Sequence, residues 1–145
     1  MSKATLTPAA VKDLAAKWYR LLDVHAPMVD VLPLLSDAPE MVFPEVTLNT
    51  LAGFEGWFQR VIRIFFDEVH TLKKCEVKIK DGEAQAKVIV EWQASIWNAP
   101  EAASKRIVCD ADQDWTVGIS PRTGQLVITR YVVNGLKYHR GSAKL

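Results

Sequence analysis

The chain has 145 residues, 49% of them hydrophobic and 24% charged, which is the composition of a folded globular protein and excludes a disordered one. Its 18 basic residues against 17 acidic ones leave a net charge of +1, which argues against a nucleic-acid-binding protein. The two cysteines, Cys75 and Cys109, are too few for a disulfide scaffold and indicate a reducing compartment. We therefore expect one cytoplasmic domain over residues 1–145, with a flexible polar tail at residues 140–145 and no membrane partner.

The N-terminal region predicts one long helix and one short helix. Thr7 before Pro8 is typical of a helix cap followed by proline at the first helical position. Apolar residues then recur every three or four positions until residues 25–27, which break the pattern. The apolar segment 28–35 contains a proline, which limits it to one or two turns that end in residues 36–39.

A second long helix follows a short strand and a loop. Residues 41–43 predict the strand and residues 45–51 the loop, after which the helix runs from Ala52 or Gly53 to Phe66. Its apolar residues cover more than a third of its circumference, so we expect it to be buried on most sides.

From residue 69 onward the hydrophobic pattern has a period of two, which predicts strands. The expected strands are residues 69–80, 84–97, 105–119 and 125–138, and Asp81-Gly82 predicts a hairpin between the first two. The strand 84–97 would be about 46 Å long if straight. Because that exceeds the diameter of about 38 Å expected for a chain of this size, the sheet must bend into a half-cone.

The order of these elements and several short motifs resemble a known superfamily. The motifs are Trp18-Tyr19, residues 41–44 (Met-Val-Phe-Pro), residues 53–58 (Gly-Phe-Glu-Gly-Trp-Phe), residues 65–70 (Phe-Phe-Asp-Glu-Val-His) and Asp114-Trp115. Over residues 5–138 the chain is similar to the cone-shaped proteins related to nuclear transport factor 2, ketosteroid isomerase, scytalone dehydratase and SnoaL-like polyketide cyclases. The resemblance implies an α+β fold, in which a curved antiparallel sheet forms a half-cone around the buried second long helix. The N-terminal helices would close this cone, and its open end would hold a ligand cavity.

The same resemblance implies an oxyanion site but lacks the usual base. Ketosteroid-isomerase-like members place a carboxylate just before the loop proline, where this chain has Phe43. Their oxyanion site pairs a tyrosine of the first helix with an acid on the third long strand, which an apolar pocket keeps neutral. Trp18 or Tyr19 matches the first position, and Asp112 or Asp114 matches the second. Phe43 therefore counts against isomerase chemistry.

His70 is the candidate general base. It lies at the predicted junction of helix and strand, next but one to Glu68 and three residues after Asp67, so a carboxylate near it would orient its ring. The alternative is a histidine whose charged form is favoured by the C-terminal end of a helix. His25 is interpreted as a residue that ends the first helix, and His139 as part of the tail.

Three aspartates, Asp110, Asp112 and Asp114, share one face of the third long strand if that strand is regular. This spacing suits a hard cation or acid–base chemistry, and it also suits a face that is simply solvated. A bulge in the strand would change which aspartate points inward. No spacing of Cys and His resembles a zinc site, and we expect neither a metal nor another cofactor.

The aromatic residues fall on apolar stripes, where they either pack in the core or form the walls of a site for a planar or apolar ligand. The candidate ligand-binding residues are Trp18, Phe43, Trp57, Phe58, Trp92 and Trp115. Trp97 and Ile89 lie on the opposite face of the second long strand, and this outer face predicts a homodimer contact.

Our leading hypothesis is a homodimer that binds a small apolar or aromatic molecule in the cavity. If it is an enzyme, the resemblance implies proton transfer of the isomerase, dehydratase or cyclase kind without a cofactor. The candidate catalytic residues are His70, Asp112, Asp114 and Tyr19. The alternative is a non-catalytic interaction or accessory protein whose cavity is filled by its own Trp and Phe side chains. An open cavity with polar groups in its wall would favour the first hypothesis.

Overall fold

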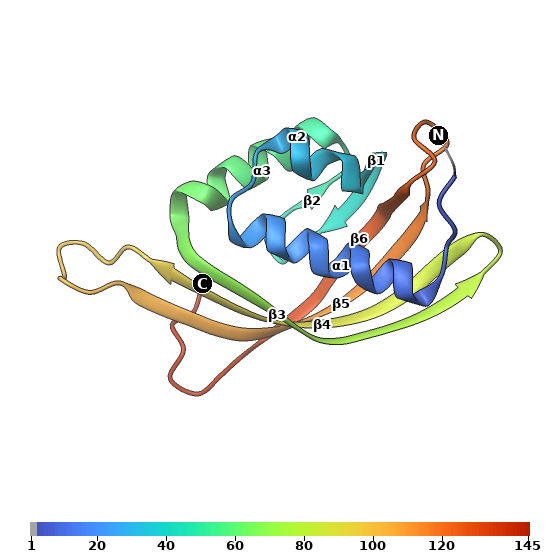
Figure 1. Ribbon diagram of the computed structural model, residues 1–145. Coiled ribbons are helices and arrows are strands. Elements are labelled where there is room, and N and C mark those ends of the chain that lie inside the picture. The colour runs from blue at the N-terminus through green and yellow to red at the C-terminus, as the bar shows by residue number, and fades with distance from the viewer. Residues whose placement is uncertain (1–2) are drawn as a thin grey trace.

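The computed structural model describes residues 3–145, which form one curved sheet with helices on its concave face (Figure 1). The helical segments are α1 (Pro8–Asp23), α2 (Met28–Val31), the 3-10 turn η1 (Leu32–Leu34) and α3 (Leu51–Ile64). The strands are β1 (Leu35–Val42), β2 (Thr47–Leu48), β3 (Phe65–Lys80), β4 (Glu83–Ile96), β5 (Lys105–Ile119) and β6 (Leu126–Tyr138). None of the helices within residues 3–145 is long and apolar enough to cross a membrane.

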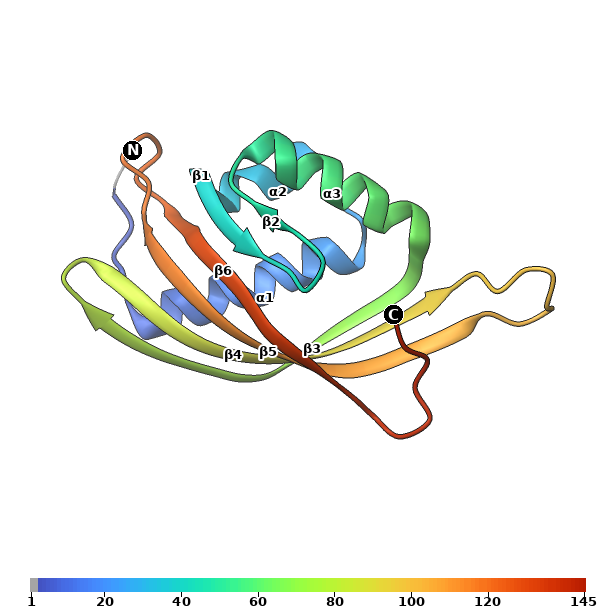
Figure 2. The same ribbon diagram turned by 180° about the vertical axis from the view of Figure 1, so that it is seen from behind.

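The sheet has the strand order β2-β1-β6-β5-β4-β3, and its long strands are strongly curved (Figures 1 and 2). Strands β3 to β6 pair antiparallel, as the sequence predicts. Strand β1 pairs parallel with β6, so the sheet as a whole is mixed, which the sequence does not predict. The prediction of an α+β half-cone is confirmed.

The hairpin between β3 and β4 has the predicted turn. Lys80 pairs with Glu83, and the two residues between them, Asp81 and Gly82, have φ angles of 54° and 77°. Positive φ at both central positions is the feature of a type I′ turn, whose twist matches that of the flanking strands. The strand that follows, β4, pairs with β5 without a shift in register.

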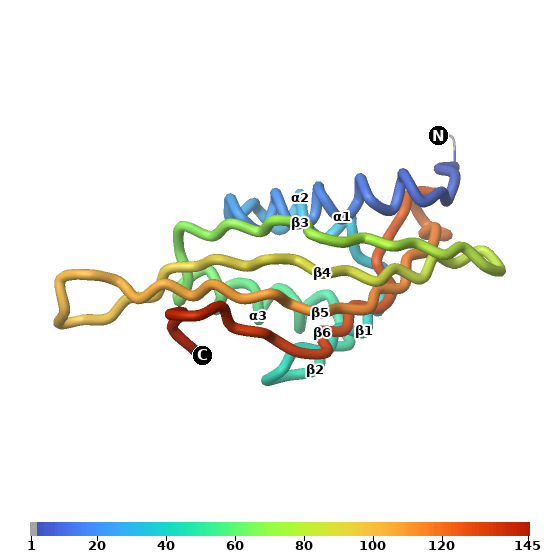
Figure 3. Tube along the Cα trace, turned by 90° about the horizontal axis from the view of Figure 1, so that it is seen from below, coloured from blue at the N-terminus to red at the C-terminus, as the bar shows by residue number. Residues whose placement is uncertain are grey.

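Helix α1 begins where the sequence predicts and lies along β3 at one edge of the sheet (Figure 3). The Thr7 side chain accepts a hydrogen bond from the N–H of Ala10 at 3.1 Å, which confirms the predicted cap. The helix ends at Asp23, and His25 beyond it turns the chain with a φ of 50°.

The segment before α3 is more extended than the sequence predicts. Turns are expected as far as residues 36–39 and a strand only at residues 41–43, but β1 already begins at Leu35. Pro39 lies inside this strand, where the register with β6 shifts between Leu35 and Glu40. A proline is tolerated there because the irregular part of the ladder does not need its missing N–H.

Helix α3 starts at Leu51, where the Thr50 side chain accepts a hydrogen bond from the N–H of Gly53 at 2.9 Å. It ends before Phe65, which already belongs to β3. Phe54 is buried in the core, as is Phe58 one turn later. The helix therefore buries one face against the core, whereas its apolar pattern predicts burial on most sides. Of its other apolar side chains, Trp57, Val61 and Ile64 border the cavity described below.

Two irregularities in β3 control which of its side chains face the helices. The register with β4 shifts between Phe66 and Val69, and again between Leu72 and Lys74. At the first shift Asp67 has a φ of 51°, a left-handed conformation that only short polar residues and glycine adopt readily. Each shift is a β-bulge, and each moves the alternation of inward and outward side chains by one residue.

The two bulges give the short stretch between them its own inward face. Phe65 before the first bulge and Cys75 after the second pack into the core, and both have odd numbers. Between the bulges the even-numbered Glu68 and His70 face the cavity, whereas Val69 is exposed. The first bulge therefore brings two titratable side chains to the concave face.

The outer face of the sheet carries Trp97, whose side chain is 73% exposed and packs against the ring of Phe66 with a centroid distance of 4.9 Å. Ile89 lies on β4, and Trp97 directly follows the end of that strand. A homodimer through this face stays a prediction.

The C-terminal residues 140–145, which the sequence suggests are loose, run back beside β5. The N–H of Ala143 donates to the carbonyl of Arg106 at 2.9 Å, and the N–H of Val108 donates to the Ser142 hydroxyl at 2.8 Å. These contacts bring Leu145 to the wall of the cavity.

We expect Asp67→Val to lower the free energy of unfolding by about 1–2 kcal/mol, because a β-branched residue is strained at positive φ. Glu76→Val is the matched control, since Glu76 is exposed on the same strand and a β-branched residue suits a regular strand. Chemical denaturation of both variants measures the difference. An equal effect of the two substitutions would show that the bulge carries no backbone constraint.

Candidate functional site

A cavity of about 330 Å³ lies on the concave face between α1, α3 and the sheet. Its lining residues are Leu22, Phe43, Pro44, Glu45, Trp57, Phe58, Arg60, Val61, Ile64, Phe65, Glu68, His70, Val90, Trp92, Ala111, Gln113, Tyr131, Val133, Leu136 and Leu145. Most of these side chains are apolar, and the polar ones in the interior are few. This is the usual make-up of a small-molecule site, and its volume is at the lower end of the usual range.

Four of the six predicted ligand-binding residues line this cavity, namely Phe43, Trp57, Phe58 and Trp92. The rings of Phe43 and Trp57 are stacked 4.0 Å apart and form one flat wall. The other two predicted residues, Trp18 and Trp115, do not line the cavity, because their side chains are packed in the core beneath it. Four of the aromatic residues thus form cavity walls and two pack in the core, and their side chains do not fill the cavity.

His70 lines the cavity, and Asp23 holds it in place. The Nδ1 atom of His70 is 2.5 Å from one carboxylate oxygen of Asp23, and the His70 backbone N–H donates to the other oxygen at 3.0 Å. The imidazole lies flat between Tyr19 and Trp92, with centroid distances of 4.8 Å and 6.3 Å. Its side chain is 10% exposed. These contacts fix the position and the plane of the ring. Its Nδ1 atom is hydrogen-bonded to Asp23, and its Nε2 atom takes no part in that hydrogen bond.

The predicted carboxylate partner of His70 exists, but it is not the neighbour in sequence. Asp67 is exposed at the bulge, whereas Asp23 lies 47 residues away at the end of α1. A carboxylate in the last turn of a helix carries no sequence signal that identifies its partner on a distant strand. Asp23 could not be found from the sequence for this reason.

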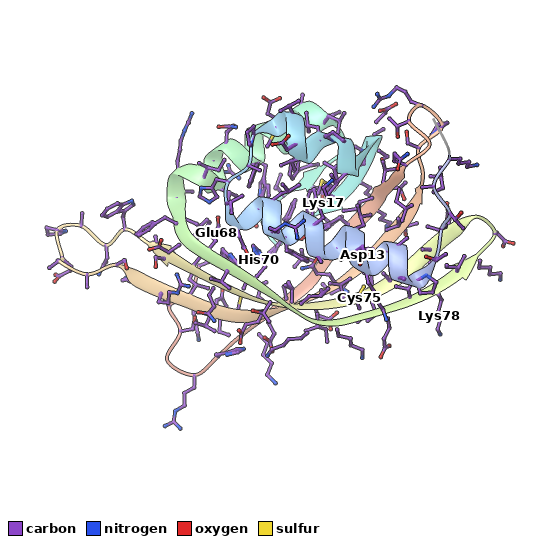
Figure 4. The ribbon with its side chains drawn as sticks, in the orientation of Figure 1. Asp13, Lys17, Glu68, His70, Cys75 and Lys78 are labelled. Carbon is purple, nitrogen blue, oxygen red and sulfur yellow. The ribbon has the colours of Figure 1, made fainter. Side chains whose placement is uncertain are left out.

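Glu68 forms a second carboxylate–imidazole pair in the same wall. Its side chain is 3% exposed, and one of its oxygens is 2.5 Å from the Nε2 of His25. The other oxygen accepts a hydrogen bond from the indole N–H of Trp92 at 3.0 Å. Figure 4 shows Glu68 and His70 on β3 where the strand passes the C-terminal end of α1. His25 lies just beyond the end of the first helix, and its side chain also contacts the site through Glu68.

Gln113 is the polar residue that β5 contributes to the cavity. Its side-chain oxygen accepts hydrogen bonds from the Tyr19 hydroxyl at 3.0 Å and from the Trp115 indole N–H at 2.9 Å. An indole N–H can only donate, so the amide oxygen must face Trp115 and the amide NH₂ must face away from it. Burial raises the pKa of Tyr131 and a hydrogen bond with the Gln113 side chain opposes that shift, so the NH₂ has the Tyr131 hydroxyl as a partner at the cavity wall.

Tyr19, a predicted catalytic residue, lies behind the site and does not line the cavity. Its hydroxyl is 3.3 Å from that of Tyr131, which does line the cavity. Burial raises the pKa of Tyr19 well above its ordinary value, and it also raises the pKa of Tyr131. Both phenols therefore stay neutral and can act as hydrogen-bond donors. The Tyr19 hydroxyl donates to Gln113, and the Tyr19 ring stacks against the ring of His70.

The prediction that Asp112 or Asp114 reaches the cavity is wrong. Strand β5 alternates regularly, and its inward residue between them is Gln113, so both aspartates lie on the outer face of the sheet. Asp112 is paired with Lys87, whose hydrogen bond lowers the pKa of the Asp112 carboxyl. Asp114 accepts a hydrogen bond from the Asn134 amide at 2.7 Å. Both side chains are about half exposed to solvent, which agrees with the simpler of the two interpretations of this acidic face.

A metal ion has no evident place in the cavity. Among residues 3–145 the one group of side chains spaced to bind a metal is Glu91, Asp110 and His139, on the outer face of the sheet. The Lys73 ammonium already lies 3.1 Å from Asp110 and 3.8 Å from Glu91. We interpret this group as a cluster of ion pairs.

Charged side chains occur at the rim of the cavity. Glu45 accepts a hydrogen bond from the Trp57 indole N–H at 2.9 Å, which fixes the aromatic wall from outside. Arg60 of α3 also lines the rim, and its side chain forms no ion pair within residues 3–145.

No protein-family model matches this chain, and no curated protein matches it in sequence. Solved structures match it in fold. A protein from Novosphingobium aromaticivorans that is provisionally named an aromatic ring hydroxylase has a TM-score of 0.77 at 15% identity, over 91% of this chain and 92% of that one. The hexachlorocyclohexane dehydrochlorinase LinA-type3 from Novosphingobium barchaimii LL02 has a TM-score of 0.73 at 14% identity, over 94% and 92% of the two chains.

A further protein from Novosphingobium aromaticivorans, provisionally named a scytalone dehydratase, has a TM-score of 0.65 at 14% identity, over 94% of this chain and 90% of that one. Similarities at such low identity establish the fold and not the activity. The chain therefore shares the fold of these solved structures.

Proposed function

We propose that this protein is an enzyme that removes a proton from a carbon atom of a small, mainly apolar molecule and so catalyses an elimination or an isomerisation. His70 is the base. The observation that carries the proposal is the Asp23–His70 pair in the wall of an apolar cavity.

The geometry around His70 supports its role as a base. Because the 2.5 Å contact between Nδ1 and the Asp23 carboxylate requires a hydrogen between them, the neutral ring carries its proton on Nδ1. The lone pair is then on Nε2, the nitrogen that is free to accept a proton. Asp23 also stabilises the positive ring that forms when the proton arrives, as a carboxylate does behind a catalytic histidine.

Gln113 of β5 also supports the proposal. Removal of a proton next to a carbonyl or a similar group places negative charge on an oxygen atom of the ligand. The amide NH₂ of Gln113 and the neighbouring Tyr131 hydroxyl can donate hydrogen bonds to that oxygen, because Tyr19 and Trp115 hold the amide oxygen in the opposite direction. A donor fixed before the reaction stabilises such charge without reorganisation.

The names of two structural neighbours agree with this chemistry. A dehydrochlorinase and a dehydratase both describe eliminations, in which a proton and a leaving group depart from the substrate. The names belong to those proteins, and they support the proposal for this chain only through the shared fold and the Asp23–His70 pair.

We expect the protein to accelerate the ring opening of 5-nitro-1,2-benzisoxazole, a planar probe for a base in an apolar cavity. The base takes the proton on carbon, the C–H electrons form a nitrile, and the N–O bond breaks to leave a coloured phenolate. His70→Ala should lower kcat/KM by about 100-fold or more, the usual contribution of a positioned base. His139→Ala, which removes an imidazole from the outer face, should leave the rate unchanged. Equal rates for the wild type and His70→Ala would overturn the proposal.

We expect Asp23→Asn to lower kcat for the same probe by about tenfold or more while KM changes little. An amide can donate to Nδ1, which would place the ring proton on Nε2 and block the base. Nitrogen-15 NMR of the histidine rings reports this change of tautomer directly. Asp13→Asn on the exposed face of α1 is the control. A variant with the wild-type tautomer and wild-type kcat would show that Asp23 has no part in the reaction.

A further inference from the structure

Two carboxylate–imidazole pairs lie side by side in the wall of the cavity, and they have opposite orientations. Both join the end of α1 to the beginning of β3: Asp23 contacts His70, and His25 contacts Glu68. In the first pair the imidazole lines the cavity and the carboxylate stands behind it. In the second pair the carboxylate lines the cavity and the imidazole stands behind it. A base alone explains the first pair but not the second.

The second pair holds a proton at the cavity wall. The 2.5 Å distance between the Glu68 oxygen and His25 Nε2 is too short for two lone pairs, so a hydrogen lies between them. The Trp92 N–H fixes the other oxygen at 3.0 Å, which sets the direction of the carboxyl group. Glu68 and His70 are two residues apart on the same face of β3, so one small molecule in the cavity can reach both.

The same pair connects the cavity to solvent. The Glu68 side chain is 3% exposed, whereas the His25 side chain is 24% exposed at the end of α1. The edge of the His25 ring rests against Phe58, with a centroid distance of 6.3 Å. Water therefore reaches the imidazole but hardly reaches the carboxylate, which is the arrangement needed to replace a proton after it has been given to a ligand.

We propose that Glu68 is the general acid of the reaction and that His25 is the positioning residue that restores its proton. This inference rests on the proposed function of His70 as the base. It also narrows the substrate: a general acid is needed when the leaving group is a poor one, such as a hydroxyl or another oxygen group, and not when it is a halide. We infer that the substrate loses an oxygen leaving group.

The proton balance of the step is complete. The ligand's C–H proton passes to Nε2 of His70, and the electrons of that bond form a new double bond as the bond to the leaving oxygen breaks. The oxygen takes the proton that Glu68 and His25 had held between them. His70 then releases its proton to water, and the Glu68–His25 pair regains one through the exposed imidazole.

Two probes that differ only in the leaving group test the inference. The first is 5-nitro-1,2-benzisoxazole, whose leaving oxygen becomes a phenolate stabilised by the nitro group. The second is unsubstituted 1,2-benzisoxazole, whose phenolate is more basic and gains more from a proton donor. Glu68→Gln should lower kcat/KM for the unsubstituted probe at least about tenfold more than for the nitro probe. Glu76→Gln, on the same strand but exposed, should change neither rate.

His25→Gln is the second variant, and it decides the test if Glu68→Gln does not fold. Glutamine can still donate a hydrogen bond to Glu68 but cannot pass a proton on. The loss of kcat/KM in this variant should therefore also be larger for the unsubstituted probe. Equal losses for both probes, or no loss, in the folded variants would overturn the role of Glu68 and leave that of His70 intact. If His70→Ala leaves the nitro probe unaffected, the proposed function itself fails and this inference with it.

Discussion

A single backbone constraint, the left-handed conformation of Asp67, underlies the arrangement of the whole site. Side chains of a strand alternate strictly between its two faces, so a one-residue insertion exchanges the faces of everything after it. Here that exchange sends Glu68 and His70 into an apolar cavity and Val69 out to solvent. The second bulge restores the original alternation, so that Cys75 returns to the core. The remainder of β3 can then pack under α1 as an ordinary strand.

Titratable groups in an apolar wall must find partners, and this requirement ties the end of α1 to β3. An unpaired carboxylate in such a place would cost several kcal/mol, roughly. Asp23 is bound twice by one residue, through the ring and the backbone N–H of His70, and Glu68 is bound by His25 and Trp92. The same contacts that satisfy these groups hold them in defined directions. The geometry of the site therefore depends on the same contacts that pack the end of α1 against β3.

The parts of the structure that depend on local sequence could be predicted, and those that depend on contacts between distant residues could not. The Thr7 cap, the turn at Asp81 and Gly82 and the regular face of β5 all follow from neighbouring residues. The parallel pairing of β1 with β6 does not, because it joins segments far apart in the chain.

The candidate site divides in the same way. His70 could be singled out because it stands where a helix changes to a strand, but its partner Asp23 could not be, since nothing local links them. Glu68 reads as an outward residue if β3 alternates without interruption. The resemblance favours Asp112 and Asp114 because acids at that position suit an oxyanion site, yet the regular alternation of β5 places Gln113 inward instead. An amide there donates a hydrogen bond without the need to keep a carboxyl group protonated.

That exchange of an acid for an amide bears on how the cavity would stabilise negative charge. A carboxyl group donates only when burial keeps it neutral, so its function depends on a raised pKa. The Gln113 amide donates at any pH, and its direction is set by the Trp115 indole, which can donate but not accept. The Tyr19 hydroxyl, held neutral by its raised pKa, occupies the remaining position on the amide oxygen. Besides Tyr131 and the charged residues at the rim, the titratable side chains that line the cavity are Glu68 and His70 of β3, which His25 and Asp23 hold from the end of α1. The proposed proton transfers therefore belong to the part of β3 that the bulge at Asp67 turns inward, whereas the Gln113 amide of β5 donates without changing its protonation state.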